Sequence, residues 1–232
     1  MPRKPRHYLP GIPAHIIQRG NNRQACFYTP EDYRFYLTCL SEAADRFDVA
    51  IHAYVLMTNH VHLLMTPAHE EGIGHLIQSV GRRYVRYING LYQRSGTLWE
   101  GRHKGSLIDS EHYLLACYRY IELNPVRANM ITDPAEYRWS SYRHHAFGEQ
   151  DPIIRDHALY ERLGKTPAER QQAYQLLFKT HVNESQLKHI RETAQSSVPL
   201  GNERFREQIE AALGRRVGSG QRGRPRKTEM AV

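Results

Sequence analysis

Residues 49 to 65 read V-A-I-H-A-Y-V-L-M-T-N-H-V-H-L-L-M, and their pattern gives the strongest indication of the architecture. It contains two strand-like apolar runs, at 49–57 and 60–65, with only T-N between them. Such a pair is typical of neighbouring strands joined by a short turn. Side chains alternate along a strand, so His60 and His62 share one face of the expected sheet. The second strand therefore presents two imidazoles on the same face.

The flanking segments predict an α+β architecture. T-P-E-D at 29–32 indicates a helix start, with Thr29 as N-cap and proline as the first helical residue. A later helix is expected to begin after Asp109 or Ser110 and to stop near Asn124, because proline follows. In chain order the segments are a strand at 14–20 with the turn G-N-N-R, the first helix, the two adjacent strands described above, a helix after the break at 72–74, an edge strand within 98–108, and the later helix. This order predicts an antiparallel sheet with helices packed mainly on one face.

A shift in composition near residue 150 divides the chain into three expected parts. Residues 1–150 form the domain just described, and 151–214 form a helical C-terminal region. In that region T-P-A-E resembles a capping box, and 202–214 reads as a capped amphipathic helix ending in glycine. Residues 215–232 form a basic tail that we expect to be disordered when free.

Composition and charge limit the classes of function. The chain has 232 residues, a net charge of +8, a pI near 9.5 and 40% hydrophobic residues, which is enough for a core. The basic surplus favours a nucleic-acid partner, although a protein can also be basic without one. Three scattered cysteines without CxxC spacing favour a reducing compartment, and neither a membrane span nor a secretory signal is evident. We therefore expect a cytoplasmic, nucleoid-associated protein.

Two constellations could carry chemistry. His60 and His62, on one strand face, could together bind a divalent ion, although an isolated H-x-H pair is more often buried and hydrogen-bonded. Tyr120 and Asn124 are four residues apart and share a helical face. A phenol becomes a useful nucleophile when its proton is removed or a cation lies near, and an asparagine carbonyl could be a ligand of that cation. A tyrosine on a helix is by itself more often a packing residue.

Five blocks in sequence order carry a resemblance to a known family. They are P-G-I-P-A-H-I-I-Q-R-G-N-N-R-Q-A-C-F, M-T-N-H-V-H-L-L, L-W-E-G-R-H-K-G, Y-I-E-L-N-P-V-R-A and Y-R-W-S-S-Y. Together they resemble the REP-associated tyrosine transposases, relatives of the single-tyrosine HUH transposases of bacterial insertion sequences. The resemblance covers about residues 5 to 147 and implies a ferredoxin-like or RRM-like HUH nuclease fold.

The resemblance also implies roles for the two constellations. His60 and His62 match the family's histidine–hydrophobic–histidine motif and would hold Mg²⁺ or Mn²⁺. Tyr120 matches the nucleophile, which would form a covalent 5′-phosphotyrosine intermediate. Asn124 matches the residue that completes the metal site, usually glutamine in the insertion-sequence branch. Glu122 is a less favoured ligand because it lies on a different side of the helix from Tyr120.

The implied activity is cleavage and transfer of single-stranded DNA at REP-like palindromic hairpins, that is, DNA transposition. Single-strand recognition combines basic grooves with stacking rings. The expected DNA contacts are Arg19, Asn21, Asn22, Arg23, Arg82, Arg83, Arg86, Arg102, Lys104 and Arg127. In the tail, Arg224 lies between glycine and proline as in the core of an AT-hook, and a nonspecific polycationic arm is the alternative.

Two other functions compete with this one. A protein could keep the fold and bind hairpins without turnover. A zinc hydrolase would need more closely spaced ligands, and Leu64 stands where H-x-H-x-D would place an acid. The sequence leaves open whether the protein is a monomer or a homodimer.

Overall fold

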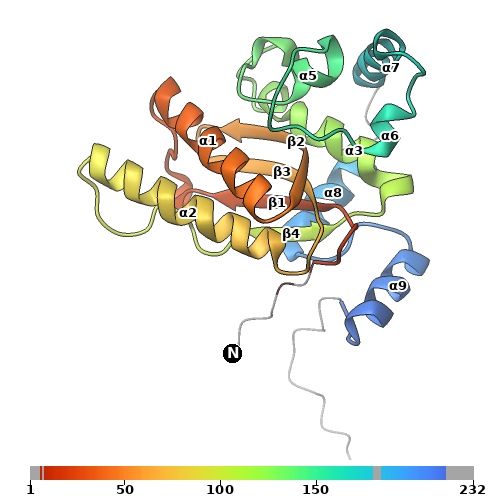
Figure 1. Ribbon diagram of the computed structural model, residues 1–232, viewed down its shortest axis with the longest axis horizontal. Helices are drawn as coiled ribbons and strands as arrows, with labels where there is room; N and C mark the ends of the chain where they lie inside the picture. The colour runs from red at the N-terminus through yellow and green to blue at the C-terminus, as the bar shows by residue number, and fades with distance from the viewer. Residues whose placement is uncertain (1–5, 7, 180–183, 218–232) are drawn as a thin grey trace, which may run out of the picture.

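The sheet contains β1 (Ala14–Arg19), β2 (Val49–Met57), β3 (His60–Pro67) and β4 (Lys104–Leu107), in the order β2-β3-β1-β4 (Figure 1). All three pairings are antiparallel. The computed structural model describes residues 6, 8–179 and 184–217. Because β3 and β1 are the inner strands, the H-V-H motif lies at the centre of the sheet and β4 forms one edge, as the sequence predicts.

The helices follow the local signals of the sequence. A capping box between Thr29 and Asp32 starts the first helix, and Asn202 caps the last, which ends at Gly214 with a φ of +61°. In chain order the helices are η1 (Asn21–Arg23), α1 (Pro30–Arg46), α2 (Gly72–Leu91), α3 (Ser110–Glu122), α4 (Asn124–Arg127), η2 (Pro134–Glu136), α5 (Tyr142–Phe147), α6 (Ala158–Glu161), α7 (Pro167–Lys179), α8 (Glu184–Ser196) and α9 (Glu203–Leu213).

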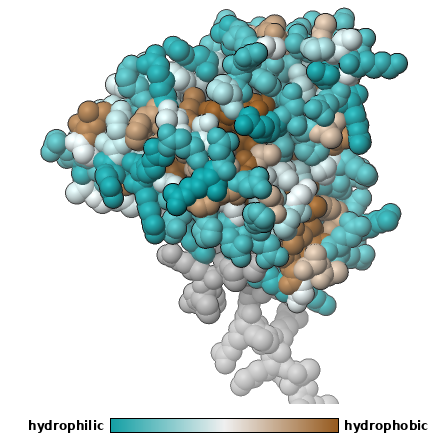
Figure 2. Space-filling model, viewed as in Figure 1, coloured by the Kyte–Doolittle hydropathy of each residue, from teal (hydrophilic) through white to brown (hydrophobic). Residues whose placement is uncertain are grey.

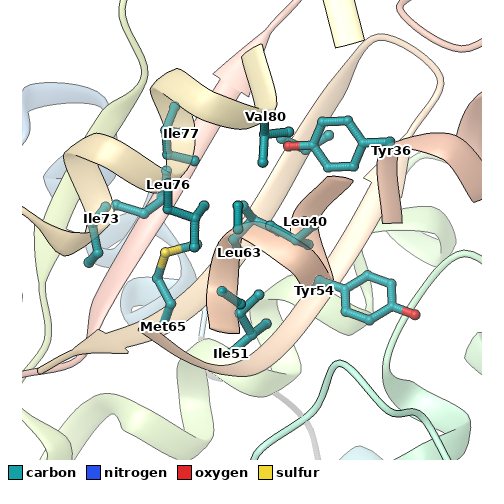
Figure 3. Packing of buried hydrophobic residues seen from close by; sticks show 14 of the residues in the cluster. Tyr36, Leu40, Ile51, Tyr54, Leu63, Met65, Ile73, Leu76, Ile77 and Val80 are labelled. Atoms are coloured by element: carbon teal, nitrogen blue, oxygen red, sulfur yellow. The ribbon is translucent and has the colours of Figure 1, made fainter. Parts of the chain in front are cut away.

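Helices α1 and α2 cover one face of the sheet and form the first core with it. Figure 3 shows the interleaved side chains, which come from α1 (Tyr36, Leu40), from α2 (Ile73, Leu76, Ile77, Val80) and from the sheet (Ile51, Tyr54, Leu63, Met65). Each large aliphatic side chain buried here stabilises the fold by about 2 kcal/mol. The outer side of this layer is largely polar, with apolar residues in separate patches (Figure 2). Leu91, at the end of α2, is 55% exposed.

The other face of the sheet is covered as well. Helix α3 packs against β2 and β3, and α8 packs against β4 and β1. Ala53, Val55 and Leu64 join a second buried cluster with residues of α3. The expected α+β class is confirmed, but helices lie on both faces rather than mainly on one. The reason is that β2 and β3 are apolar on both faces, so each face needs a cover.

The helix that carries Tyr120 ends earlier than expected. Helix α3 stops at Glu122, and Asn124 begins the separate short helix α4. The backbone bends at Leu123, which has a φ of −83° and a ψ of +2°. Proline can occupy the first turn of a helix, so Pro125 is accommodated inside α4 instead of following the end of α3.

The C-terminal region contacts the sheet directly. Ile154 bridges to Ile51 of β2, and the Arg155 amide donates to the Ile51 carbonyl at 2.8 Å. The boundary near residue 150 stays a prediction, as do the other parts of the expected division. Of the expected tail, residues 218–232 lie outside the described residues. Among the described residues, no helix combines the length and apolar character needed to cross a membrane.

Buried histidines should make stability depend on pH. Burial lowers the pKa of His52 to about 4 and that of His103 to about 3, against 6.5 in an unfolded chain. Below pH 6.5 these histidines bind protons in the unfolded chain but stay neutral in the folded chain. The free energy of unfolding should therefore fall from pH 6.5 toward pH 4. Each such histidine contributes at most about 1.4 kcal/mol per pH unit. Urea unfolding at pH 7.5 and pH 5 measures this.

His52 offers a control for this prediction. Its two ring nitrogens bond the Arg155 carbonyl at 2.6 Å and the Thr66 hydroxyl at 2.8 Å. A His52→Gln variant keeps polar atoms there but cannot titrate, so its stability should change less between the two pH values. Equal stability of the wild-type chain at pH 7.5 and pH 5 would contradict the prediction.

Candidate active site

A cleft of about 480 Å³ opens on the face of the sheet opposite α1 and α2. His60 and His62 of β3 line it together with Tyr120 of α3 and Asn124 of α4. The other lining residues are Ile17, Arg19, Glu100, Gly101, Arg102, Lys104, Arg127, Ala128, Arg191 and Gln195. The two constellations expected from the sequence thus meet in one cleft, although α3 ends before Asn124.

The register of the sheet explains which strand residues line the cleft. Arg19 pairs with His60, and Ile17 pairs with His62 on one side and with Lys104 on the other. Residues directly opposite each other on neighbouring strands project from the same face. A row of side chains from three strands therefore forms the floor of the cleft.

Each histidine is held through its Nδ1 atom. His62 Nδ1 lies 2.8 Å from His15 Nε2, and His60 Nδ1 lies 2.7 Å from the Asn59 side-chain oxygen. Burial is the main cause that lowers the pKa of His62 well below its usual value and that of His60 to about 4. Both imidazoles are therefore neutral at physiological pH, which is the form that binds metal ions.

The donor atoms that remain fit a divalent cation. The neutral ring of His60 donates Nδ1–H to Asn59 and so keeps a lone pair on Nε2. The Asn124 side chain interacts with His60, while its amide nitrogen is buried without a partner among the described residues. His62 also offers Nε2 when its Nδ1–H donates to His15. Two imidazole nitrogens and an amide oxygen can hold such an ion, with its remaining positions open to solvent or substrate.

Tyr120 lies between the candidate metal ligands and the guanidinium group of Arg127. Its ring meets the rings of His15 and His62 edge-on, with centroids 5.6 and 5.7 Å apart. The Arg127 guanidinium carbon lies 4.4 Å from the centre of the Tyr120 ring, and its Nη2 donates to the Tyr120 carbonyl. Burial lowers the pKa of Arg127 to about 10, so Arg127 stays charged at neutral pH.

Glu122 is directed away from the cleft, as expected. Its carboxylate is fully buried and accepts hydrogen bonds from the Ser141 hydroxyl at 2.5 Å and the Tyr174 hydroxyl at 2.6 Å. His145 Nδ1 lies 2.9 Å from the same carboxylate. Glu122 therefore anchors α3 to the C-terminal region on the opposite side from Tyr120.

The structure separates the residues expected to contact DNA into groups. Arg19, Arg102, Lys104 and Arg127 line the cleft, whereas Asn21, Asn22 and Arg23 form η1 beyond the end of β1. Arg82, Arg83 and Arg86 lie on α2, whose apolar side packs on the opposite face of the sheet, and Arg83 is paired with Glu42. Arg224 lies outside the described residues. All of these contacts remain predictions.

Several residues that line the cleft or lie behind it were not expected from the sequence. His15 supports His62, and the period-two alternation of β1 could have placed it on the same face as Arg19. Arg191 and Gln195 come from α8, which is distant in sequence from every motif used above. No local signal marks them, because their position depends on how α8 packs.

Fold and cleft together place two strand histidines beside a helical tyrosine in a basic cleft. The family model described as "Transposase IS200 like" matches residues 9–124, half of the chain. The chain therefore belongs to the IS200-like transposase family, a family of DNA transposases, and the resemblance inferred from its motifs is confirmed.

One solved structure supports the fold, and a second is similar to a lesser degree. A structure of the REP-associated tyrosine transposase bound to a REP hairpin is 16% identical, with a TM-score of 0.56 over 68% of this chain and 93% of that one. A putative transposase from Deinococcus radiodurans is 21% identical, with a TM-score of 0.36 over 50% of this chain and 94% of that one. A search of curated proteins found no significant match.

Proposed function

We propose that this transposase cleaves and transfers single-stranded DNA at REP-like hairpins through a covalent 5′-phosphotyrosine intermediate on Tyr120. The observation that carries the proposal is that His60, His62, Tyr120 and Asn124 line one cleft together with basic side chains. That combination provides a nucleophile, a ligand set for a divalent cation and a surface that attracts a phosphodiester.

The residues of the cleft suit an in-line displacement. The Tyr120 phenol loses its proton to solvent, its oxygen bonds to phosphorus, and the bond from phosphorus to the 3′ oxygen breaks. The released 3′ oxygen takes up a proton, and the 5′ phosphate stays on the tyrosine. Attack by another 3′ hydroxyl on that phosphotyrosine reverses the exchange and joins strands without an added energy source.

His60, His62 and Asn124 would hold Mg²⁺ or Mn²⁺ in this proposal. A bound ion supplies Lewis-acid polarisation of the phosphate and helps to orient it. The family is one in which metal dependence is general, and the neutral imidazoles described above suit such an ion.

Arg127 is the side chain best placed to bind the scissile phosphate. It remains charged, packs over the Tyr120 ring, and has a buried Nη1 atom without a hydrogen-bond partner among the described residues. A phosphate oxygen would satisfy this donor, and charge-assisted bonds of this kind are among the strongest in proteins.

Five basic side chains and one acidic side chain line the cleft, namely Arg19, Arg102, Lys104, Arg127 and Arg191 with Glu100. This surface suits the backbone of a single strand entering the cleft. The similar fold described as bound to a REP hairpin supports a hairpin as the substrate, with its single-stranded flank leading to Tyr120.

The decisive experiment uses the full chain and a labelled single-stranded hairpin with flanking sequence. With Mg²⁺ or Mn²⁺ present, a denaturing gel should show a DNA-linked protein band, and a chelator should prevent it. Hairpin binding without any adduct across a panel of flanking sequences would reject the proposal in favour of a non-catalytic hairpin-binding protein.

Support of His62 by His15 gives a separate prediction. Only the tautomer in which His62 Nδ1–H donates to His15 leaves the His62 Nε2 lone pair for an ion. Removing such an outer partner lowers metal affinity by about 10- to 100-fold. We therefore expect His15→Ala to weaken Mn²⁺ binding by this factor in a calorimetric titration. Affinity equal to that of the wild-type chain would show that His15 only fills space.

A further inference from the structure

A second group of candidate ligands lies outside the cleft. His144 and His145 of α5 and Asp156, which precedes α6, each place a ligand atom within 4.8 Å of the others. His144 Nε2 lies 3.2 Å from Asp156 Oδ1, and His145 Nε2 lies 3.8 Å from the same oxygen. Figure 1 shows α5 and α6 grouped with α7 beside α3, and none of the three residues lines the cleft.

The Nδ1 atom of each imidazole already has a hydrogen-bond partner. His145 Nδ1 lies 2.9 Å from the buried Glu122 carboxylate, and His144 Nδ1 lies 3.1 Å from the Glu149 carbonyl. The Glu122 carboxylate accepts from His145 Nδ1–H, so a singly protonated His145 ring has its lone pair on Nε2. His144 Nδ1 also accepts from the Asp151 amide at 3.4 Å, so the His144 Nε2 proton points to Asp156 and is displaced when an ion binds. Metal-binding histidines are oriented in this way by a carboxylate or carbonyl behind the ring.

His145 Nε2 is not explained by hydrogen bonding. The side chain is completely buried, and this nitrogen has no partner among the described residues. Its separation of 3.8 Å from Asp156 Oδ1 is too long for a hydrogen bond. A hydrogen bond from His144 to Asp156 satisfies those two side chains alone. It leaves the buried lone pair of His145 Nε2 facing the Asp156 carboxylate. A cation between the three groups removes this conflict.

We propose that His144, His145 and Asp156 bind one transition-metal ion of the Zn²⁺ class. Tetrahedral zinc with ligands at 2.0–2.2 Å sets its ligand atoms about 3.4 Å apart. The separations of 3.2 and 3.8 Å lie on either side of this value. Two imidazoles and one carboxylate are a set that favours zinc over magnesium. The side chains of His144 and Asp156 are 20% and 29% exposed, which leaves a route for water as the fourth ligand.

The ion at this site has a structural role. It joins α5 to the segment that precedes α6, and through His145 and Glu122 it is connected to α3. Tyr120 lies two residues before Glu122, so the ion stabilises the packing behind the helix that carries it. This inference does not depend on the function proposed for the cleft.

The test separates the two sites in the full chain. A His60→Ala, His62→Ala variant lacks the cleft imidazoles, so Zn²⁺ that it binds must be held elsewhere. Titration against a chromophoric chelator should give one Zn²⁺ per chain in this variant, and Zn²⁺ should raise its melting temperature. Adding His144→Ala and Asp156→Asn, at two partly exposed positions, to this variant should reduce the number of bound Zn²⁺ ions per chain to zero. It should also abolish the Zn²⁺-dependent rise in melting temperature. Adding His69→Ala instead, at an exposed histidine, should change neither result.

Two outcomes overturn the proposal. One is that the His60→Ala, His62→Ala variant binds no Zn²⁺. The other is that this variant still binds one Zn²⁺ per chain after His144 and Asp156 have been replaced. Should the cleft variant fail to fold, the same titration of the wild-type chain against His144→Ala, Asp156→Asn decides the matter by whether one Zn²⁺ per chain is lost. Adduct formation on a hairpin is measured separately, so failure here does not affect the conclusion about Tyr120.

Discussion

Replacing Tyr120 with phenylalanine should abolish the covalent protein–DNA adduct while the chain continues to bind its hairpin. Phenylalanine keeps the ring that meets His15 and His62 and that lies under the Arg127 guanidinium. Only the attacking oxygen is lost, and deleting the nucleophile of a covalent catalyst reduces turnover by at least about 10⁴-fold. A denaturing gel measures the adduct, and a mobility-shift assay of the same samples measures binding.

Tyr118 provides a matched control two residues away. Its ring packs against His145 and Tyr174 in the second core, on the side of α3 that faces away from the cleft. Tyr118→Phe should therefore form the adduct at the wild-type rate. An adduct that persists in Tyr120→Phe and disappears in Tyr118→Phe would mean that the wrong tyrosine has been assigned as the nucleophile.

The second large effect is expected from removing both imidazoles of β3. In the His60→Ala, His62→Ala variant the cleft keeps its basic residues but loses two of three proposed ligands. Loss of an outer partner alone costs up to about 100-fold, so loss of the ligands themselves should reduce cleavage by more than that. Cleavage should be followed as a function of Mn²⁺ concentration, since added ion should fail to restore the rate.

Hairpin affinity distinguishes a loss of the cleavage reaction from a general loss of structure or of DNA binding. The Arg and Lys side chains of the cleft remain in this variant, so hairpin affinity and its dependence on salt should stay close to those of the wild-type chain. His69→Ala, at an exposed position, serves as the control for histidine loss. Normal metal-dependent cleavage by the double variant would exclude His60 and His62 as ligands.

The local parts of the fold could be predicted because short-range signals determine them. Thr29 with the following proline and Asp32 specifies the start of α1, and the alternation in H-V-H-L-L specifies which residues of β3 share a face. These features depend on residues within one turn or one strand of each other.

The parts that could not be predicted depend on packing across long sequence separations. Helix α8 supplies Arg191 and Gln195 to a cleft whose motif lies at 57–64, and nothing near those two residues marks this position. The bend at Leu123 was missed because proline is compatible both with stopping a helix and with starting the next. The second layer of helices could not be predicted because the face of the sheet that α3 and α8 cover depends on contacts with distant strands.

The anchoring of Glu122 sets a lower limit on the length of chain that can work alone. Its partners Ser141, His145 and Tyr174 all lie beyond residue 124, where the match to the family ends. A fragment cut at that point would leave the Glu122 carboxyl group without its hydrogen-bond partners on the helix that carries Tyr120. The smallest autonomous unit of this protein therefore extends at least through α7, and fragments shorter than this should be insoluble or unfolded when expressed.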